Sequence, residues 1–483
     1  MENKENISAQ RVEIEYSFGE VKKFFQTGAT LPLSYRLKAL NSLADAILKY
    51  ESEILKALYA DLGKSKTEAY ITEIVGLKTE IKYFIKNLKR LAAPQTRTPV
   101  LEQAPSRLRV IYEPYGVALI ISPWNYPFLL SLAPLIDAIA AGNCAIVKPS
   151  AYSPRVSAVI KKVCKAAFEP GHVTVIEGGR EENNALLDMK FDYIFFTGSP
   201  EVGKVVMKAA SKNLVPVTLE LGGKSPCIVD DTADINKAAR RILFGKLTNS
   251  GQTCIAPDYV LVKENVKDEL ISQLLLELNK AIPNAEYFRN SFGKIVNKKH
   301  FERLLSLLQG ESPIYPTYVK KWDYSYIQNK NGILADYERR KMFPVLLDDP
   351  NPAARVMQEE IFGPILPIIN WSNAEAMQNN FKYTDKPLAL YIFSEDRKFV
   401  NDTIRKISSG GVTVNDTLMH LVSPDAPFGG VGKSGMGNYH GAAGFRTFSH
   451  ERTVLFKSTA IEIPMRSHPY SERTFRLFKK IFK

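Results

Sequence analysis

An alternation of apolar strands and amphipathic helices between residues 116 and 212 constrains the fold more than any other feature of the sequence. The strand patterns fall at 116–121, 144–147, 173–177 and 193–196. The helical patterns between them fall at 128–141, 154–168 and 201–212, and Ser153 and Pro154 suit the N-cap and first turn of the second one. Strands that are apolar throughout and alternate with helices predict a parallel sheet covered on both faces.

A second unit of the same kind follows Glu220-Leu221-Gly222-Gly223, and we interpret its glycine pair as a hinge. The strands expected there are 225–229, 259–263, 343–347, 365–369 and 388–393, with helices at 235–247 and 267–281. Ahead of the first unit, the sequence predicts helices at 37–49, 54–61 and 73–91, a proline-broken connection at 94–105 and a short strand at 108–112. The fold class is therefore α/β with parallel sheets.

With 483 residues, 45% of them hydrophobic and 24% charged, the chain has the composition of a globular protein with a large core. Its length suits roughly three domain-sized units. These figures exclude a disordered, collagen-like or disulfide-scaffold protein. The uncharged stretch from 117 to 136 approaches the length of a membrane span, but Pro123 and Pro127 interrupt it, so we expect a buried strand, a turn and a buried helix.

Of the net charge of +13, +5 lies in residues 466–483, which hold six Lys and Arg residues against one Glu, and the other 465 residues hold only +8. A nucleic acid is therefore not an expected partner. The four cysteines, Cys144, Cys164, Cys227 and Cys254, show neither a zinc spacing nor a disulfide pattern, and the polar N-terminus lacks the apolar core of a secretory signal. We expect a cytoplasmic protein without a bound metal.

Three residues of different chemistry stand where catalytic groups are useful. Cys254 lies in a loop between a predicted helix and a predicted strand, Glu220 ends a β-rich run beside the glycine pair, and Asn125 lies in the turn after strand 116–121. A thiol nucleophile, a carboxylate base and an amide oxyanion donor are together what acyl chemistry on a cysteine requires. Each also has an ordinary alternative: a small buried apolar residue, a solvated carboxylate and a turn-forming residue, respectively.

Two turns at predicted strand ends are candidates for ligand binding. The turn Gly198-Ser199-Pro200-Glu201-Val202-Gly203 opens a helix and resembles a dinucleotide fingerprint without matching it, so a cofactor turn and a tight structural turn both remain open. Lys148 stands in the second turn, Lys148-Pro149-Ser150, at the carboxyl end of a neighbouring strand, where parallel sheets bind ligands.

Seven motifs, all in the family's order, resemble the aldehyde dehydrogenase superfamily. They are PWNYPF (123–128), AGNCAIVKPS (141–150), FFTGSPEVG (195–203), LELGGKSP (219–226), GQTCIAPDY (251–259), MQEEIFGPILP (357–367) and PFGGVGKSGMGNYHG (427–441). The residues of the GQTCIAPDY and SGMGNYHG segments are most similar to those of the class 3 branch. The resemblance extends over about residues 16 to 457.

The resemblance implies two Rossmann-like α/β domains and a small β bridging element. The implied cofactor-binding domain comprises 1–95 and 112–221, the catalytic domain 222–415, the bridging element 96–111 and 416–465, and the basic tail 466–483. The implied activity is oxidation of aliphatic (medium or long-chain) or aromatic aldehydes to carboxylic acids with NAD or NADP, by a homodimer. The alternatives are a CoA-acylating relative and a catalytically silent structural or membrane-binding relative.

The same resemblance suggests a role for each site residue. Cys254 resembles the nucleophile, Asn125 with the Cys254 backbone N–H resembles the oxyanion hole, and Glu220 resembles the base that activates water to hydrolyse a thioester. The residues that resemble cofactor contacts are Lys148 for the adenosine ribose, Gly198, Ser199 and Gly203 for the pyrophosphate, Glu360 and Phe362 for the nicotinamide ribose and ring, and also Leu221 and Trp124.

Two positions depart from the family's pattern. Ala151 stands where the family usually has a Glu that binds the adenosine ribose hydroxyls. Loss of that carboxylate removes a repulsion against a 2′-phosphate, so we expect NADP to be accepted at least as well as by typical members. Pro134 stands where many members of the wider superfamily have a lysine, which class 3 members also lack.

The tail places Phe475, Phe478, Ile481 and Phe482 at helical spacing opposite a basic face. This pattern is typical of a helix lying on an anionic membrane surface, which would give peripheral membrane contact. A helix docked on the protein's own surface, or a frayed end, fits the pattern equally well.

Overall fold

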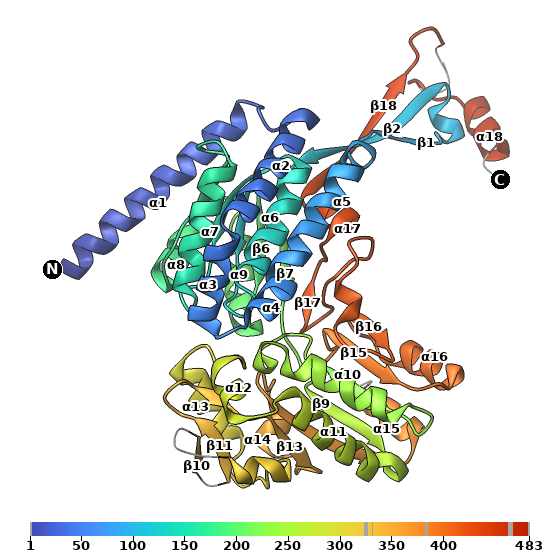
Figure 1. The fold of residues 1–483 in the computed structure, drawn as a ribbon. Coiled ribbons are helices and arrows are strands. Elements are labelled where there is room, and N and C mark those ends of the chain that lie inside the picture. The colour runs from blue at the N-terminus through green and yellow to red at the C-terminus, as the bar shows by residue number, and fades with distance from the viewer. Residues whose placement is uncertain (1, 323–326, 331, 382–384, 462–466, 482–483) are drawn as a thin grey trace.

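The computed structural model describes residues 2–322, 327–330, 332–381, 385–461 and 467–481. Two six-stranded sheets, each with its own helices, make up the body, and a narrow three-stranded sheet projects from it (Figure 1). This arrangement confirms the predicted α/β class with parallel sheets.

The first sheet has the strand order β17-β7-β6-β3-β4-β5, and only β17 runs antiparallel to its neighbour. Its strands are β3 (Val117–Ile121), β4 (Cys144–Lys148), β5 (Val173–Val175), β6 (Tyr193–Thr197), β7 (Val217–Glu220) and β17 (Gly435–Met436). In β3, Ala118 and Ile120 belong to one core cluster while Val117, Leu119 and Ile121 belong to another on the opposite face. Both faces are therefore buried, which explains why the strand is apolar throughout.

Helices cover both faces of this sheet. One layer contains α2 (Leu33–Lys49), α3 (Glu51–Leu62), α5 (Gly76–Leu91), α6 (Leu129–Ala141), α7 (Pro154–Ala167) and α17 (Gly441–Thr447). The other contains α1 (Glu2–Gln26), α8 (Arg180–Leu187) and α9 (Pro200–Ser211). The strand, turn and helix predicted for 117–136 are confirmed as β3 and α6. Among the residues that the structure describes, no helix has the length and apolarity needed to cross a membrane.

The second sheet is wholly parallel, with the order β13-β14-β9-β8-β15-β16. Its strands are β8 (Pro226–Val229), β9 (Tyr259–Lys263), β13 (Val345–Asp348), β14 (Ile365–Trp371), β15 (Ala389–Phe393) and β16 (Gly411–Val414). The helices of this half are α10 (Ile235–Leu247), α11 (Lys267–Ala281), α12 (Ala285–Asn290), α13 (Lys298–Leu307), α14 (Arg355–Gln358), α15 (Ala374–Asn380) and α16 (Arg397–Lys406).

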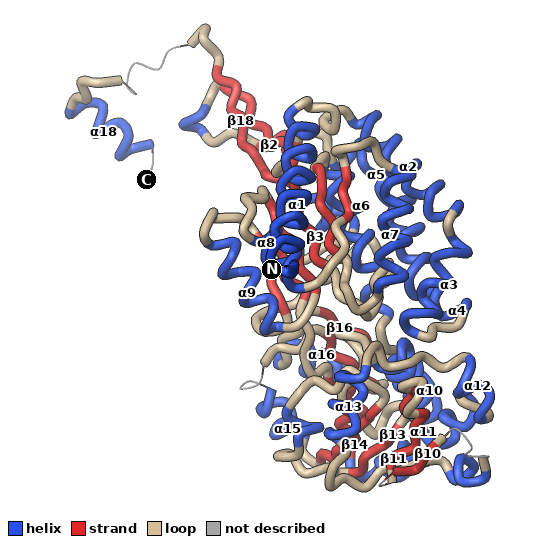
Figure 2. The backbone as a smooth tube through the Cα atoms, turned by 90° about the vertical axis from the view of Figure 1, so that its left-hand side faces the viewer, coloured by secondary structure: helices blue, strands red, loops and turns tan. Residues whose placement is uncertain are grey.

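The projecting arm is an antiparallel sheet of β1 (Gln95–Arg97), β2 (Ser106–Pro114) and β18 (Ser449–Lys457), with β18 at one edge. It brings together segments more than 300 residues apart, with Val110 opposite Thr453. Beyond it lies α18 (Glu472–Ile481), which stands apart from the body in both views (Figure 2). The tail positions Arg466, Phe482 and Lys483 are outside the described residues.

Several elements differ from the sequence prediction. The helix predicted at 73–91 starts earlier than expected: α4 (Lys66–Ala69) and a π-helical turn (Tyr70–Val75) lead into α5, so residues 73–75 are in the π-helical turn. The segment 416–465 is not confined to the arm, because its β17 pairs with β7 and its α17 packs on α5 and α6. The sequence analysis did not predict the small sheet of β10 (Gln328–Lys330), β11 (Ile333–Asp336) and β12 (Lys341–Met342). Its strands are short, and the exposed β10 consists of polar residues without apolar alternation.

Candidate active site

Cys254 lies in a loop whose backbone is held in an unusual conformation. The loop follows α10 and contains three successive residues with positive φ: Asn249 at 53°, Ser250 at 54° and Gly251 at 74°. A Cβ on Gly251 would lie 2.3 Å from the carbonyl oxygen of Gly363, so only glycine fits there. The loop is thus pressed against the segment that carries Glu360 and Phe362.

Hydrogen bonds fix the backbone on both sides of the cysteine. The Gln252 side chain donates to the carbonyls of Asn249 (3.0 Å) and Lys294 (3.1 Å) and accepts from the Val296 amide (3.0 Å). On the other side, the Tyr391 hydroxyl donates to the Ile255 carbonyl at 2.5 Å. Hydrogen bonds of this kind hold a candidate nucleophile in one position.

Asn125 lies in the turn between β3 and α6 and reaches the same loop. Its Nδ2 donates to the carbonyl of Gln252 at 3.1 Å, and its own carbonyl accepts from Asn249 Nδ2 at 2.8 Å. An amide group carries two N–H bonds, and the contact with Gln252 uses one of them. The turn after β3 and the cysteine loop are therefore joined in both directions.

Glu220, the last residue of β7, is buried, and neither of its carboxylate oxygens has a hydrogen-bond partner among the described residues. Burial raises the pKa of this carboxyl well above its usual range, because the charged form loses its hydration. A carboxyl without partners, at a strand end, is a candidate general base.

Glu360 occupies space that the glycine pair leaves open. A Cβ on Gly222 would lie 2.3 Å from the carboxylate oxygen Oε2 of Glu360, while Oε1 has no partner among the described residues. Burial, and secondarily Asp258, raises the pKa of Glu360 to about 8. Arg303 holds the backbone of this segment, because its guanidinium donates to the carbonyls of Glu360 (3.2 Å) and Ile361 (2.5 Å).

The electrostatics of Cys254 show which groups surround its sulfur. Burial raises the pKa of the thiol to about 12, and the carboxyls of Glu360 and Glu220 add to the shift. The backbone amides of Cys254 and Ile255 lower it. The structure therefore brings Cys254, Glu220 and Glu360 together at one place, although they come from different elements.

The predicted cofactor turn caps a helix. Ser199 precedes α9, and its hydroxyl accepts from the Val202 amide at 3.5 Å. A Cβ on Gly203 would lie 2.9 Å from Leu221, so the small residue lets α9 approach the end of β7 closely. A Cβ on Gly198 would lie 2.5 Å from the Phe196 ring. The first turn of α9 thus presents backbone N–H groups, as pyrophosphate binding needs.

Lys148 ends β4 and is buried apart from the Cys254 cluster. Its Nζ donates to the carbonyls of Gly178 (2.6 Å) and Pro149 (2.9 Å), and burial lowers the pKa of the amine to about 8. The carboxylate of Glu182 lies against Gly178 and accepts from the Gly179 amide at 2.5 Å.

The rings of Trp124 and Phe362, two further predicted cofactor residues, meet edge to face with their centres 5.4 Å apart.

These features fit a nicotinamide dinucleotide. Such ligands bind at the carboxyl ends of parallel strands. Lys148 ends β4, the capped helix α9 follows β6, and the unpartnered oxygen belongs to Glu360, which lies against Gly222 just after β7. Sequence reasoning missed a second group of residues, which hold the backbone around the site through hydrogen bonds rather than line it: Lys64, Glu73, Asn249, Lys224 and Arg303. Lys224 Nζ, for example, donates to the carbonyls of Val356 and Glu359, both at 3.0 Å. Lys224 lies within the LELGGKSP motif, but no sequence signal marks Lys64, Glu73 or Arg303.

The comparison with known proteins gives one answer throughout. The sequence profile of the aldehyde dehydrogenase family matches residues 5–454. The chain is 47% identical over 470 residues to 4,4'-diaponeurosporen-aldehyde dehydrogenase of Staphylococcus aureus, covering 97% of this chain and 99% of that protein. It is 41% identical to aldehyde dehydrogenase family 3 member A2 of Rattus norvegicus, with 92% and 88% of the two chains covered. A solved structure of Staphylococcus aureus AldH in its substrate-bound state superposes with a TM-score of 0.90 at 47% identity, over 97% of this chain and 99% of that one. The chain belongs to the aldehyde dehydrogenase family and is most similar to its class 3 branch.

Proposed function

We propose that this protein oxidises apolar aldehydes to carboxylic acids with NAD or NADP, through a thioester on Cys254. The observation that carries the proposal is the convergence of the Cys254 thiol, the unpartnered Glu220 carboxyl and the Asn125 amide from three elements of two sheets. These are the nucleophile, base and oxyanion donor of acyl chemistry.

In the proposed sequence, the Cys254 thiolate attacks the aldehyde carbon, and the carbonyl oxygen becomes an oxyanion held by the second N–H of Asn125 and the Cys254 backbone N–H. The residues assigned to the cofactor would hold a nicotinamide, which would supply the hydride acceptor needed to turn this adduct into a thioester on the sulfur. Glu220 then removes a proton from water, the resulting hydroxide adds to the thioester carbon, and the carbon–sulfur bond breaks to release the carboxylic acid and the Cys254 thiolate. Glu220 has no other hydrogen-bond partner among the described residues, which suits a base that acts on a transient water.

Members of the family use NAD or NADP. In this chain we assign Lys148 to the adenosine ribose, Gly198, Ser199 and Gly203 to the pyrophosphate, Glu360 to the nicotinamide ribose, and Phe362, Trp124 and Leu221 to its surroundings. We propose that NADP is accepted beside NAD, because Ala151 is exposed near the buried Lys148 and contributes no carboxylate. The carboxylates of Glu177 and Glu182 raise the pKa of Lys148, against the effect of burial, and so limit how strongly a 2′-phosphate is preferred.

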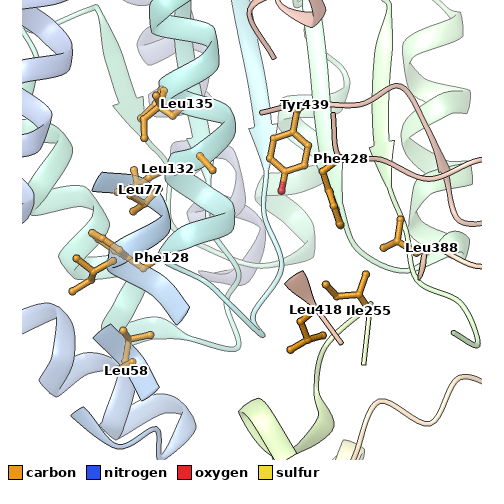
Figure 3. Packing of buried hydrophobic residues seen from close by; sticks show 14 of the residues in the cluster. Leu58, Leu77, Phe128, Leu132, Leu135, Ile255, Leu388, Leu418, Phe428 and Tyr439 are labelled. Carbon is orange, nitrogen blue, oxygen red and sulfur yellow. The ribbon is translucent and has the colours of Figure 1, made fainter. Parts of the chain in front are cut away.

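The surroundings of Cys254 favour an apolar substrate. Cys254 packs against the main core cluster, in which Leu418 lies beside Ile255 and Phe428 beside Tyr439 (Figure 3). A polar substrate would lose hydration there without compensation. We therefore propose medium or long-chain aliphatic aldehydes or aromatic aldehydes, in line with the apolar residues that pack around Cys254.

We also propose that the arm mediates a homodimer, since its edge strand β18 exposes Leu455 and Phe456 and one of its edges pairs with no strand in the described part of the chain. For the tail we propose peripheral contact with an anionic membrane by an otherwise cytoplasmic protein. Phe475 and Ile481 of α18 are 60% and 46% exposed, and Arg473, Arg476, Lys479 and Lys480 share the same short helix.

The experiment that tests the proposed function measures reduced-cofactor absorbance with an aliphatic and an aromatic aldehyde, with and without added CoA. We expect carboxylic acid as the product without CoA, and Cys254→Ser to abolish turnover while cofactor binding persists. Product formation that requires CoA would identify the acylating alternative. Absence of turnover by the wild-type protein that nonetheless binds cofactor would indicate a silent relative.

A further inference from the structure

A fully buried ion pair lies behind the Asn125 turn. Lys64, between α3 and α4, and Glu73, in the π-helical turn, have side chains with 0% exposure, and the Nζ–Oε1 distance is 2.6 Å. Removing both charges from water is costly, and the cost is offset only where further hydrogen bonds complete the pair. Single π-helical turns occur frequently at functional sites.

Those further hydrogen bonds all go to the turn that carries Asn125. Lys64 Nζ donates to the Asn125 carbonyl at 3.1 Å and lies 4.0 Å from the centre of the Tyr126 ring. Glu73 Oε2 accepts from the amides of Phe128 (3.1 Å) and Leu129 (2.9 Å), at the start of α6. The cation thus holds a carbonyl at one end of the turn, and the carboxylate holds amides at the other.

We propose that Lys64 and Glu73 are positioning residues, which orient the Asn125 amide so that its second N–H meets the oxyanion. Two donors, Lys64 Nζ and Asn249 Nδ2, fix the Asn125 peptide from its carbonyl side, and Gln252 takes one amide N–H. An oxyanion donor is effective only within a few tenths of an ångström of its place, so the direction of the amide depends on the peptide behind it. The inference rests on the proposed role of Asn125 as oxyanion donor.

A merely structural role would be different. In that case the pair would only stabilise the start of α6. Its loss would lower the melting temperature, and the size of any effect on the rate would be the same with Asn or Ala at position 125. A double-mutant cycle between positions 64 and 125 separates the two roles, since residues that act through one another have non-additive effects.

The experiment compares Lys64→Met, Asn125→Ala and the double variant in the full chain. The readouts are kcat for aldehyde oxidation and, without cofactor, hydrolysis of an activated ester, which also forms an oxyanion at Cys254. We expect Asn125→Ala to lower both rates about 100-fold and Lys64→Met about tenfold. The double variant should match Asn125→Ala within about twofold. The cofactor Kd should not change in any of them.

Lys267→Met is the matched control, because Lys267 is a mostly buried lysine that pairs with Asp348 and Asp349 away from the site. It should leave both rates unchanged. Lys64→Arg, which keeps a charged donor, should recover most of the rate. If Lys64→Met does not fold, Glu73→Gln replaces it in the cycle with the same expected non-additivity.

Multiplying effects, with the double variant slower by about 1,000-fold, would overturn the inference and leave a structural role. An unchanged rate in Lys64→Met and in Glu73→Gln would also overturn it. If Asn125→Ala itself leaves both rates intact, the proposed oxyanion role fails, and this outcome is distinct from failure of the positioning inference.

Discussion

The Nδ2 of Asn125 donates to the carbonyl of Gln252 at 3.1 Å, across the junction between the two sheets. Asn125 follows β3 of the first sheet, and Gln252 lies two residues before Cys254 in the loop that leads to β9 of the second. The proposed oxyanion donor and the proposed nucleophile are therefore held in one hydrogen-bonded unit. Any movement of one sheet against the other must carry or break that contact, which couples the geometry of the site to the packing of both halves.

The raised pKa of Cys254 predicts slow alkylation near neutral pH. Because iodoacetamide reacts with the thiolate and the pKa is about 12, the rate should rise about tenfold for each pH unit up to that range. Mass spectrometry would locate the label on Cys254, since Cys144, Cys164 and Cys227 are buried.

Glu360→Gln should accelerate this alkylation only at higher pH. The pKa of Glu360 is raised to about 8, so the carboxyl is neutral below pH 8 and repels the thiolate only above it. The wild-type and variant rates should therefore coincide at pH 7 and diverge by pH 9, with Glu359→Gln as the neighbouring control. Equal rates at both pH values would show that Glu360 does not act on the sulfur.

Glu220→Gln should separate formation of the thioester from its hydrolysis. We expect one equivalent of reduced cofactor per active site in a rapid burst, followed by steady-state turnover about 100-fold slower than wild type. Because burial raises the pKa of Glu220, its basic form grows as pH rises, so wild-type kcat should increase with pH while the variant stays flat. Stopped-flow absorbance gives both phases. Wild-type steady-state turnover by Glu220→Gln would assign the base elsewhere.

Ala151→Glu should weaken NADP binding selectively. A carboxylate at this exposed position repels the 2′-phosphate, so the NADP Kd should rise about tenfold while the NAD Kd changes little. Ala151→Gln, of the same size but neutral, is the control and should leave both constants near wild type. Quenching of tryptophan fluorescence measures the two affinities in the cofactor-free protein. A parallel loss for both cofactors would mean that position 151 lies outside the ribose site.

Removal of the residues after Pro469 should abolish sedimentation with vesicles that contain anionic lipid and leave catalysis intact. The helix α18 exposes Phe475 and Ile481 and carries four basic residues, which neutral vesicles should not attract. Replacing Phe475 and Ile481 by Ser in the full chain tests the apolar face separately from the charge. Binding that survives the truncation would place any membrane contact elsewhere on the protein.

Local patterns in the sequence were enough for most strands of the two large sheets and for the order of the motifs, but not for β16 and β17. Strand 117–121 is buried on both faces and apolar throughout, whereas burial alternates along strand 259–263. The bounds of α10 and α11 coincide with the predicted ones, because the apolar residues of both helices recur with a regular helical period. The arm was harder, since β18 pairs with β2 across more than 300 residues and its exposed surface carries no apolar pattern.

The sequence by itself determined the α/β class, the family and the residue types able to do acyl chemistry, because these depend on local periodicity and on short motifs. Only the tertiary structure decided that Glu220 and Glu360 are desolvated around Cys254, and that the Lys64–Glu73 pair lies behind Asn125. Burial and Coulomb interaction depend on distances between segments far apart in the chain. Lys64 and Asn125 are 61 positions apart, and nothing in either segment records that the fold places them 3.1 Å from each other.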